Sequence, residues 1–591
     1  MTRRVFALAA AALAATGLLT TSGSHAADAG ANDSCPWVNS TATAQVRAAQ
    51  VLAQMTTDEK LSMTHGTQLP GYDGVVAPIA RLCIPALNLQ DGGAGVVMGG
   101  TTAMPAPIAA AATFDPSIER TYGTVVGNEA HTKGVSVNLG PNVNLERDPR
   151  GGRVFEGAGE DPYLAGAMAT NYVQGVQSQG VMADIKHFVA NDTEQNRNNG
   201  DAIVDERTLN EMYYPAFKQA VQQGHAASIM AATSLLNGVH DNENSYLLKQ
   251  TAKQDWGFDG FVVTDWDGAR STVQAANAEL DLTMPTPGNF GQPLADAVRA
   301  GQVSMAVLND KVVRLLTEEF TYGLFDHPAG SPGAVATTPA HVQTAQDIAA
   351  AGTVLMKNDG SLLPLDPNNT PSVAVIGEAA KAAPITGGGG SSHVPADTGS
   401  VVSIVDGITK RLGSAGRVDY INGWNASAFA SGGGAPASML DNDPNTRWSS
   451  GTPMAPDQNQ YVTVDMGGPQ KIDQITMDSG ASTGDYARGY QVYLSTDGTT
   501  WGGPVAIGTG TASPSVVDFP EQTARYVKVV QTGTSSSWWS IAEFTAADKN
   551  ASGTEVTLPR TGGVHVPAVN DTLPTVPGAQ FTTSAGTPGL T

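Results

Sequence analysis

The sequence predicts a chain of several domains: a parallel α/β barrel, a smaller α/β layer and an antiparallel β-sandwich. Residues 40–325 alternate short apolar strands with amphipathic helices, a pattern that is typical of a parallel sheet. Near residue 425 the helical periodicity stops, and short alternating strands separated by Gly, Ser, Asp and Thr follow. The length of 591 residues leaves room for about four domains.

Composition excludes several classes of protein. Apolar residues make up 41% of the chain and charged residues 15%, which is enough apolar material for large cores and too little charge for an extended disordered chain. The formal net charge is −23 and the sequence has no basic stripe, so we expect no nucleic-acid partner.

The segment 1–26 has the pattern of a secretory signal peptide. Arg3 and Arg4 precede an apolar run at 5–19, and small residues follow up to Ala26. A membrane anchor is the alternative, but the run is shorter than the ~20 residues that span a bilayer. We therefore expect a secreted, extracellular protein with no membrane partner.

The two cysteines are Cys35 and Cys83. In an exported protein such a pair is expected to form one disulfide, and two separate buried thiols are the alternative. No histidine lies at a spacing that would complete a zinc site with them.

The region 40–325 predicts a (β/α)8-like TIM barrel. Eight strand–helix units would close a barrel of ~250 residues, which is about the size of this region. The strands are expected at 135–139, 181–185, 228–232 and 261–264, and two of the helices at 207–221 and 306–320.

The rest of the chain divides by composition. A linker is expected at 326–340, because Pro, Gly and Ser dominate it. Residues 341–425 predict a partial α/β sandwich domain with only two strands. Residues 426–548 predict the β-sandwich, and residues 549–591 are expected to be a linker or a truncated C-terminus.

Polar side chains gather where the predicted barrel strands end. The carboxyl ends of barrel strands meet at one mouth, so we expect these side chains to converge. An acid, several cations, a His and a Trp suit a neutral polyol, because charged groups hydrogen-bond hydroxyls and an indole stacks on the C–H face of a sugar. The set comprises Asp91, Arg150, Arg153, Lys186, His187, Asp265 and Trp266.

The residues alone leave other roles open. Asp265 could cap a helix. Lys186 could form a Schiff base, as in barrel aldolases, or an ion pair. Arg153 could bridge Glu156 or Glu160, and Trp266 could be a core residue.

An ordered series of motifs runs through the barrel region and into the next domain. The motifs are Met55-Thr-Thr-Asp-Glu-Lys60, Ile84-Pro85, Asp91-Gly-Gly-Ala-Gly-Val96, the run from Leu139 to Arg153, Phe155-Glu156, Glu160-Asp-Pro162, Ile185-Lys-His-Phe188 with Asn191 and Arg197, the run from Trp256 to Trp266, Val354-Leu-Met-Lys-Asn358 and Leu363-Pro-Leu365. This series resembles glycoside hydrolase family 3, the β-glucosidase-like enzymes, over almost the whole barrel region.

The resemblance implies a retaining exo-β-glycosidase that hydrolyses terminal, non-reducing β-linked sugars, best described as a β-glucosidase. Asp265 matches the nucleophile, which forms a glycosyl-enzyme that water releases. Basic neighbours such as Lys186 and Arg153 favour its ionised form. No cofactor is implied for catalysis. Sugar-binding roles in the innermost subsite fall to Asp91, Arg153, Lys186 and His187, with Met230 and Trp266 lining it.

Two departures from the family pattern affect the expected chemistry. The family has Tyr-Asn where this chain has Thr233-Ser234, and that Tyr normally hydrogen-bonds the nucleophile, which the shorter Thr233 is not expected to reach. The family's acid/base Glu lies further along the second domain, which here gives way to the sandwich. No acid/base is therefore assigned, and the chain is interpreted as a fragment or as interrupted by an insertion. The acids considered and set aside are Glu378, Glu555 and Asp571.

These departures generate expectations of their own. Without an acid/base, the chain is expected to cleave activated aryl glycosides better than oligosaccharides. An incomplete α/β domain is expected to expose a sheet edge and to lower solubility. A catalytically impaired or non-catalytic glycan-binding protein is the alternative to the enzyme.

A second set of motifs lies in the predicted sandwich: the run from Met439 to Ser450, Val464-Asp-Met-Gly467, Tyr493 to Gly498 with Trp501, Ala524 to Lys528, and Trp538 to Ile541. This set resembles the coagulation factor V/VIII type C, or discoidin-like, domain and implies a carbohydrate-binding module with a polysaccharide partner. We expect Trp448 in the core and either burial or a stacking face for Trp538 and Trp539. The resemblance also implies that Asp441 and Asp443 bind a structural Ca²⁺, with ordinary turn chemistry as the alternative.

Overall fold

The computed structural model divides into two compact units. The first comprises residues up to 90 with 130–152 and 169–332, and the second comprises 91–129, 153–168 and the rest of the chain from 333. The predicted signal peptide, Glu378, Asp441 and Asp443 lie outside the described residues, as does the chain beyond 549. The structure describes residues 35–327, 330–370, 372–376, 380, 390–395, 401–421, 424–440, 444–512 and 514–549.

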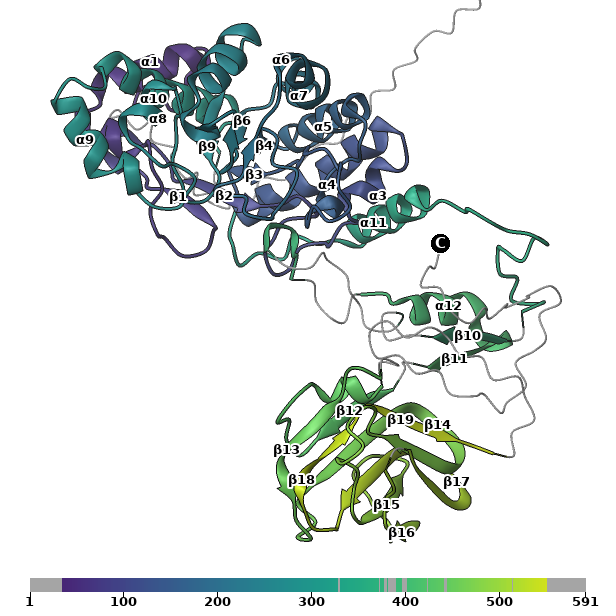
Figure 1. The fold of residues 1–591 in the computed structure, drawn as a ribbon. Coiled ribbons are helices and arrows are strands. Elements are labelled where there is room, and N and C mark those ends of the chain that lie inside the picture. Colours follow the sequence, from purple (N-terminus) through teal and green to yellow (C-terminus); the bar gives the residue numbers. More distant parts are fainter. Residues whose placement is uncertain are drawn as a thin grey trace, which may run out of the picture. The chain divides into compact units, whose positions relative to one another are not determined.

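A curled six-stranded sheet forms the centre of the first unit (Figure 1). Its outer pair is antiparallel and its last four strands are parallel and almost wholly buried, as strands covered on both faces must be. In spatial order the strands are β1 (Gly74–Val76), β2 (Leu87–Asp91), β3 (Val137–Leu139), β4 (Met182–Phe188), β6 (Ser228–Ala231) and β9 (Phe261–Thr264).

Two short segments join the edges of this sheet. Single bridges link Val263 to Leu282, His65 to Thr283, and Thr67 to Val75. The path from β9 through 282–283 and 65–67 therefore returns to β1. The TIM-barrel-like fold class is confirmed, with six strands and two bridging segments in place of eight regular strands.

Helices flank the barrel strands, and the two whose bounds were predicted lie close to the expected positions. The helix expected at 306–320 is α10 (Met305–Thr321), whose first turn is capped by the Ser304 hydroxyl. The helix expected at 207–221 contains a π-helical middle (η3, Leu209–Tyr213). Further helical elements of the first unit are α1 (Ala44–Gln54), α2 (Thr57–Ser62), η1 (Ala80–Leu82), α6 (Glu206–Thr208), α7 (Tyr214–Gln222), η4 (Asp241–Glu243), η5 (Tyr246–Asp255), α8 (Val273–Asn277), η6 (Gly288–Phe290) and α9 (Gln292–Arg299).

The N-terminal segment is fastened to the barrel by three kinds of contact. Cys35 and Cys83 form the expected disulfide. The Trp37 indole donates a hydrogen bond to the carbonyl of Leu82 at 3.0 Å. Arg47 pairs with Asp326 through both terminal nitrogens, at 2.8 and 2.6 Å, a bidentate geometry that fixes orientation as well as charge.

The α/β part of the second unit contains two parallel strands, β10 (Ser372–Ile376) and β11 (Arg417–Ile421), with helix α12 (Ile404–Leu412). Helix α11 (Pro339–Gly352) begins inside the predicted linker, because Thr338 caps its first turn and Pro339 suits the first helical position. The apolar residues that follow it, Val354, Leu355 and Met356, are exposed. Three further helices follow in chain order. Helix α3 (Pro107–Ala111) belongs to the second unit, and α4 (Pro116–Lys133) and α5 (Pro162–Gln177) contribute to both units.

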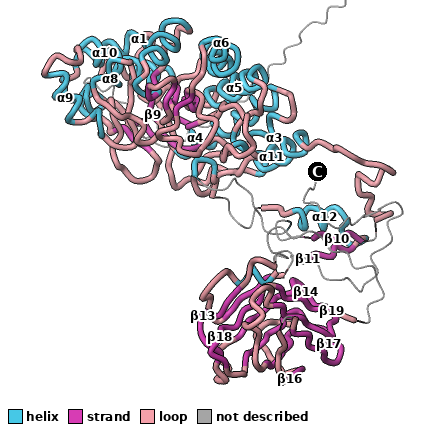
Figure 2. Tube along the Cα trace, viewed as in Figure 1, coloured by secondary structure: helices cyan, strands magenta, loops and turns pink. Residues whose placement is uncertain are grey.

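The C-terminal strands form the predicted antiparallel β-sandwich (Figure 2). Trp448 is fully buried, as predicted, and meets Trp539 edge to face at 5.3 Å between ring centroids. The larger sheet has the order β12 (Asn425–Ala428), β14 (Tyr461–Asp478), β17 (Ser515–Gln531), β15 (Tyr490–Ser495) and β16 (Ala506–Gly508), with β19 (Glu543–Ala547) on β14; the smaller pairs β13 (Trp448–Met454) with β18 (Ser535–Ile541).

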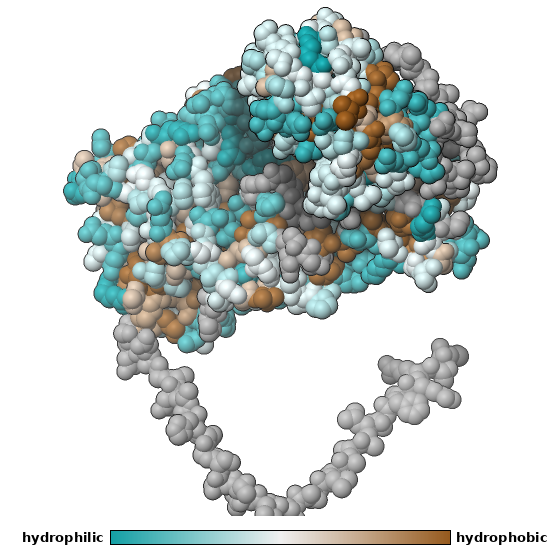
Figure 3. All heavy atoms as spheres, turned by 90° about the horizontal axis from the view of Figure 1, so that it is seen from below, coloured by the Kyte–Doolittle hydropathy of each residue, from teal (hydrophilic) through white to brown (hydrophobic). Residues whose placement is uncertain are grey.

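The surface is chemically mixed. Teal hydrophilic and brown hydrophobic side chains alternate in patches over the face drawn in Figure 3. Among the described residues, no helix combines the length and the apolar character that crossing a bilayer requires.

One buried carboxyl predicts a pH dependence of stability. Glu319 in α10 is buried, its Oε2 has no hydrogen-bond partner among the described residues, and burial raises the pKa of its carboxyl to about 8 from 4.5. Between these values unfolding releases a proton, so stability falls as pH rises, by up to ~1.4 kcal/mol per pH unit for this group.

The variant Glu319→Gln is expected to flatten this dependence in part, because burial also raises the pKa values of Glu119 and Glu318 to about 8. Denaturant unfolding at pH 5 and pH 8 measures the effect, with the exposed Glu211→Gln as the matched control. Equal pH dependence in wild type and Glu319→Gln would contradict the assignment.

Candidate active site

Asp265 lies directly after β9, and one of its carboxylate oxygens accepts a hydrogen bond whereas the other accepts none from the described residues. Its Oδ1 accepts the backbone N–H of Trp266 at 2.6 Å. Its Oδ2 has no hydrogen-bond partner among the described residues, although the side chain is only 10% exposed. A buried carboxylate fixed through one oxygen leaves the other available for reaction.

The local sequence explains why the chain places Asp265 there. The four residues of β9 are buried on both faces, and the backbone N–H of Val262 donates to Asp281 Oδ2 at 2.8 Å. The Thr264 hydroxyl accepts the N–H of Met284 at 2.9 Å. Strand β9 is therefore locked to the 281–284 segment up to the residue before Asp265.

Two basic side chains face the open oxygen. Arg197 Nη2 lies 3.5 Å from Asp265 Oδ2, and His187 Nε2 lies 3.9 Å from it. Arg197 also pairs with Glu194 at 3.2 Å, so its charge is shared between two carboxylates. A guanidinium at this distance forms an ion pair with the carboxylate.

Lys186 and His187 were expected to follow a strand, and this placement is wrong. Strand β4 continues to Phe188, so both residues lie inside it and are buried. The strand is longer because the loop at 141–143 pairs with it. The Lys186 N–H donates to the carbonyl of Pro141, and the Lys186 carbonyl accepts from the Val143 N–H. The His187 N–H donates to Asn144 Oδ1 at 2.9 Å.

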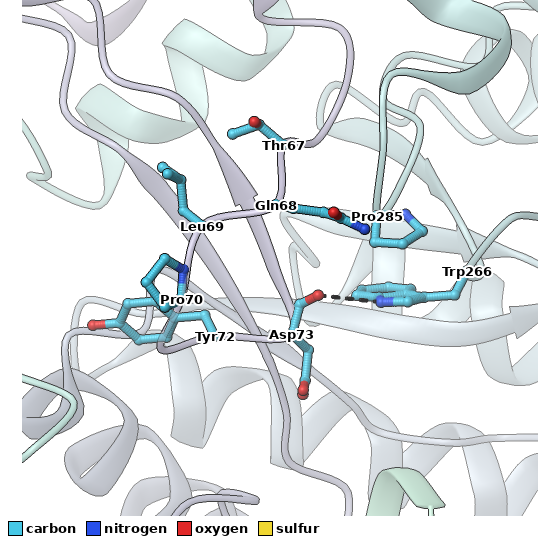
Figure 4. A pocket seen from close by; sticks show the side chains of 8 residues that line it. All are labelled: Thr67, Gln68, Leu69, Pro70, Tyr72, Asp73, Trp266 and Pro285. Atoms are coloured by element: carbon cyan, nitrogen blue, oxygen red, sulfur yellow. Dashed lines mark hydrogen bonds between the residues drawn. The ribbon is translucent and has the colours of Figure 1, made fainter.

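Met230 and Trp266 belong to one apolar cluster. Met230 is buried in β6, whereas Trp266 packs against the same cluster and remains partly exposed. The Trp266 indole N–H donates to the carbonyl of Asp73 at 3.3 Å, which fixes the ring beside the 67–73 loop (Figure 4). Trp266 is thus only in part a core residue.

The Thr233 position shows what this chain has in place of the family tyrosine. The Thr233 hydroxyl donates to the carbonyl of Arg197 at 3.4 Å. Within the part of the chain that the structure describes, this short side chain makes no hydrogen bond with the carboxylate of Asp265. Ser234 donates to Asp241, whose pKa is raised well above its usual value by burial. Thr233 therefore supports the backbone of Arg197.

Asp91 and Arg153 belong to the second compact unit. Asp91 is the last residue of β2, and its carbonyl accepts Val97 N–H at 2.9 Å. Arg153 pairs with Glu156 at 2.6 Å, which is one of the two ion pairs that the sequence analysis left open. It also donates a hydrogen bond to Ser391 Oγ at 2.6 Å. Their sugar-binding roles stay predictions.

Sequence reasoning assigned no role to Arg197 or Asn144. Both stand in motifs that the sequence displays, but the loops that carry them have no periodicity from which a contact could be inferred. The sequence shows that a basic residue, Arg197, follows β4, but nothing in it indicates that this residue contacts Asp265. Among the described residues, no group of three or more His, Cys, Asp or Glu side chains is arranged to hold a metal ion.

A barrel with a buried carboxylate, two basic neighbours and a partly exposed indole at its strand ends resembles the sites of glycoside hydrolases. Residues 40–318 match the model of the Glycosyl hydrolase family 3 N terminal domain, and residues 424–544 match the F5/8 type C domain. The barrel region is thus similar to glycosyl hydrolase family 3 and the sandwich to the F5/8 type C domains, which confirms both predicted resemblances.

The similar proteins are β-glucosidases. A β-glucosidase of Rhizobium radiobacter is 38% identical over 383 residues, which cover 64% of this chain and 46% of that protein. The solved β-glucosidase 3B of Thermotoga neapolitana has a TM-score of 0.58 at 34% identity, covering 62% of this chain and 54% of its own. DesR, a Streptomyces venezuelae β-glucosidase in complex with D-glucose, has a TM-score of 0.60 at 28% identity, covering 85% and 64%. The chain spans about half the length of the curated relatives it matches.

The contact between Arg197 and Asp265 predicts a kinetic effect. Arg197→Met is expected to lower kcat/KM for an activated aryl glycoside at least about tenfold, because ~1.4 kcal/mol of stabilisation is a modest value for a buried charged contact. Arg197→Lys is expected to retain more activity. The exposed Arg207→Met is the control. Wild-type kcat/KM in Arg197→Met would show that the guanidinium does not act on Asp265.

Proposed function

We propose that this chain is a secreted, retaining exo-β-glucosidase that acts through a glycosyl-enzyme on Asp265. The observation that carries the proposal is the carboxylate itself, with Oδ1 held by Trp266 N–H and Oδ2 open beside Arg197 and His187. The family of the barrel and the names of its relatives support glucose as the sugar.

Each residue has a role in the proposed reaction. Asp265 Oδ2 attacks the anomeric carbon and the leaving group departs with the bonding electrons; water then releases the sugar and restores the carboxylate. Arg197 pairs with the attacking oxygen of the nucleophile. His187 and Lys186 are positioned by the 141–144 loop to bind sugar hydroxyls, and Trp266 provides an aromatic wall. The general acid stays unassigned.

Trapping the intermediate tests the proposal. Incubation with 2,4-dinitrophenyl 2-deoxy-2-fluoro-β-glucoside, followed by peptide mass spectrometry, is expected to place one fluoroglucosyl group on Asp265. Asp265→Asn is the matched control and should remain unlabelled. Absence of label under turnover conditions would support the non-catalytic glycan-binding alternative, and a label on another residue would overturn the assignment of the nucleophile.

The unassigned acid predicts a dependence on the leaving group. Aryl β-glucosides with acidic phenols need no proton, so 2,4-dinitrophenyl β-glucoside is expected to be cleaved ~10²–10⁴-fold more efficiently than cellobiose. A series of phenols of graded acidity, measured as kcat/KM, gives the slope. Similar efficiency on cellobiose and on the activated glycoside would show that an acid/base acts within the chain.

Export is a separate part of the proposal and rests on the segment 1–26. Expression in a host with an active secretory pathway is expected to give extracellular protein that begins at Ala27. N-terminal sequencing measures this, and cell-retained protein that begins at Met1 would contradict it.

We further propose that the sandwich binds a polysaccharide through Trp538. Side chains alternate between the two faces of β18, so Trp538 is 46% exposed and Trp539 is only 1% exposed. Pro453 on β13 is the cross-strand neighbour of Trp538. An exposed indole beside a proline ring forms a flat apolar surface that suits the C–H face of a sugar.

Retention on an insoluble glucan tests the proposed role of Trp538. Trp538→Ala is expected to weaken retention about tenfold, since loss of one stacking contact is worth ~1–2 kcal/mol, without changing cleavage of a soluble aryl glucoside. Ile507→Ala, another exposed apolar position of the sandwich, is the control. Unchanged retention by Trp538→Ala would exclude this surface as the binding face.

A further inference from the structure

A long connection after strand β4 brings Arg197 to the proposed nucleophile. The connection runs from residue 189 to residue 205, and its one strand is the short β5 (Asp201–Ala202). Arg197 Nη2 lies 3.5 Å from Asp265 Oδ2. A connection of this length adopts many conformations unless other parts of the fold hold its backbone. We call residues 197–204 the Arg197 strap.

A small hairpin lies alongside the Arg197 strap and pairs with it. The Leu235 N–H donates to the carbonyl of Gly200 at 2.9 Å, and the Asn237 N–H donates to the carbonyl of Ala202 at 3.0 Å. The first strand of the hairpin therefore runs parallel to β5. The hairpin consists of β7 (Leu235–Leu236), the turn at 237–238 and β8 (Val239–His240).

The side chain of Asn237 extends this pairing by one more residue. Its Oδ1 accepts the N–H of Val204 at 2.9 Å, and its Nδ2 donates to the carbonyl of the same residue at 2.8 Å. A carboxamide offers one acceptor and two donors, so it can satisfy both backbone groups of a neighbouring residue as a strand would. Asn237 thus continues the ladder beyond the last residue of β7.

The turn holds Asn237 in the conformation that this contact needs. Asn237 has a φ of 51° and Gly238 a φ of 84°, which is the Asn-Gly pattern of two-residue hairpin turns. Asn tolerates the left-handed region better than most residues. The Gly238 N–H also donates to Asp201 Oδ1 at 2.9 Å, so both residues of the turn bind the Arg197 strap.

The other end of the Arg197 strap is held at Arg197 itself. The hydroxyl of Thr233, a residue that is 1% exposed, donates to the carbonyl of Arg197 at 3.4 Å. The carbonyl of Thr233 in turn lies 3.2 Å from His240 Nδ1. One continuous segment, residues 233–240, therefore contacts the strap at positions 197, 200, 202 and 204.

We propose that Asn237 is a positioning residue for the guanidinium of Arg197. The inference rests on the proposed function, in which Arg197 pairs with the attacking oxygen of Asp265. Asn237 holds the last residue of the Arg197 strap, and so it limits the conformations in which the guanidinium leaves Asp265. Loss of a purely structural contact would lower stability alone, whereas loss of a positioning contact slows the attack by Asp265.

The variant Asn237→Gly tests this role, because it removes both side-chain hydrogen bonds while Gly-Gly still suits the turn. The rate of labelling of Asp265 by 2,4-dinitrophenyl 2-deoxy-2-fluoro-β-glucoside is expected to fall about three- to tenfold. The Ki of methyl 1-thio-β-glucoside, which binds without reacting, is expected to stay unchanged. Asn39→Gly is the matched control, since Asn39 is also exposed and has a φ of 54°.

A double-mutant cycle with Arg197→Met shows whether the effect passes through the guanidinium. If it does, Asn237→Gly slows labelling in the wild-type background and has no further effect in Arg197→Met. Three results overturn the inference and leave the proposed function standing: an equal loss in both backgrounds, a wild-type labelling rate in Asn237→Gly, or a weaker affinity for the thioglucoside in place of a slower reaction.

Tryptic cleavage after Arg197 reports on the strap without any need for activity. Asn237→Gly is expected to be cut there severalfold faster than wild type and Asn39→Gly, because the strap opens more often. If the wild-type chain neither hydrolyses nor becomes labelled, the proposed function fails and cleavage decides the role of Asn237. Equal cleavage rates then reject that role, and faster cleavage confined to Asn237→Gly supports it.

Discussion

The carboxylate of Asp265 is held by the peptide that follows it, and the rest of the site depends on this contact. Trp266 N–H occupies Oδ1, so Oδ2 is the oxygen that faces Arg197 and His187. Two hydrogen bonds hold β9 in place up to Thr264, the residue before Asp265. Asp281 accepts from the Val262 N–H, and the Thr264 hydroxyl accepts from the Met284 N–H. A barrel strand thus delivers a charged group in one orientation, which is the preorganisation that catalysis needs.

Trp266 links the nucleophile to the closure of the barrel. Its backbone orients the nucleophile, and its indole forms a wall of the pocket beside the 67–73 loop. Residues 65–67, where this loop begins, bridge the segment after β9 to β1 and so help to close the barrel. Barrel closure and the wall beside Trp266 are consequently built from one short stretch of chain.

The sequence predicted the elements that strong local patterns determine. The buried strand before Asp265 and the helix α10 were placed within a residue or two, because apolar periodicity and a capping serine define them. The end of β4 was misplaced, since Lys186 and His187 are polar residues that become buried only when the 141–144 loop pairs with the strand. Tertiary pairing of this kind leaves no trace in local periodicity.

The candidate site was predictable in its residue types and less so in its contacts. The exposed Trp538 and buried Trp539 follow from strand alternation, but the sequence did not reveal which of the two faced inward, because the register of β18 is set by its pairing with β13. Arg197 lies in an irregular loop, so its contact with Asp265 required the three-dimensional structure. Thr233 was expected to fall short of the nucleophile, and the structure shows it bonded to the backbone of Arg197.

The most direct measurement of the central claim replaces the carboxylate with an external anion. Asp265→Gly, incubated with 2,4-dinitrophenyl β-glucoside and azide, is expected to regain turnover and to release α-glucosyl azide, because azide enters the space that the nucleophile vacates, on the face opposite the leaving group. The anomeric configuration is measured by NMR. Formation of β-glucosyl azide, or no rescue in a folded variant, would contradict the account of Asp265 as the nucleophile.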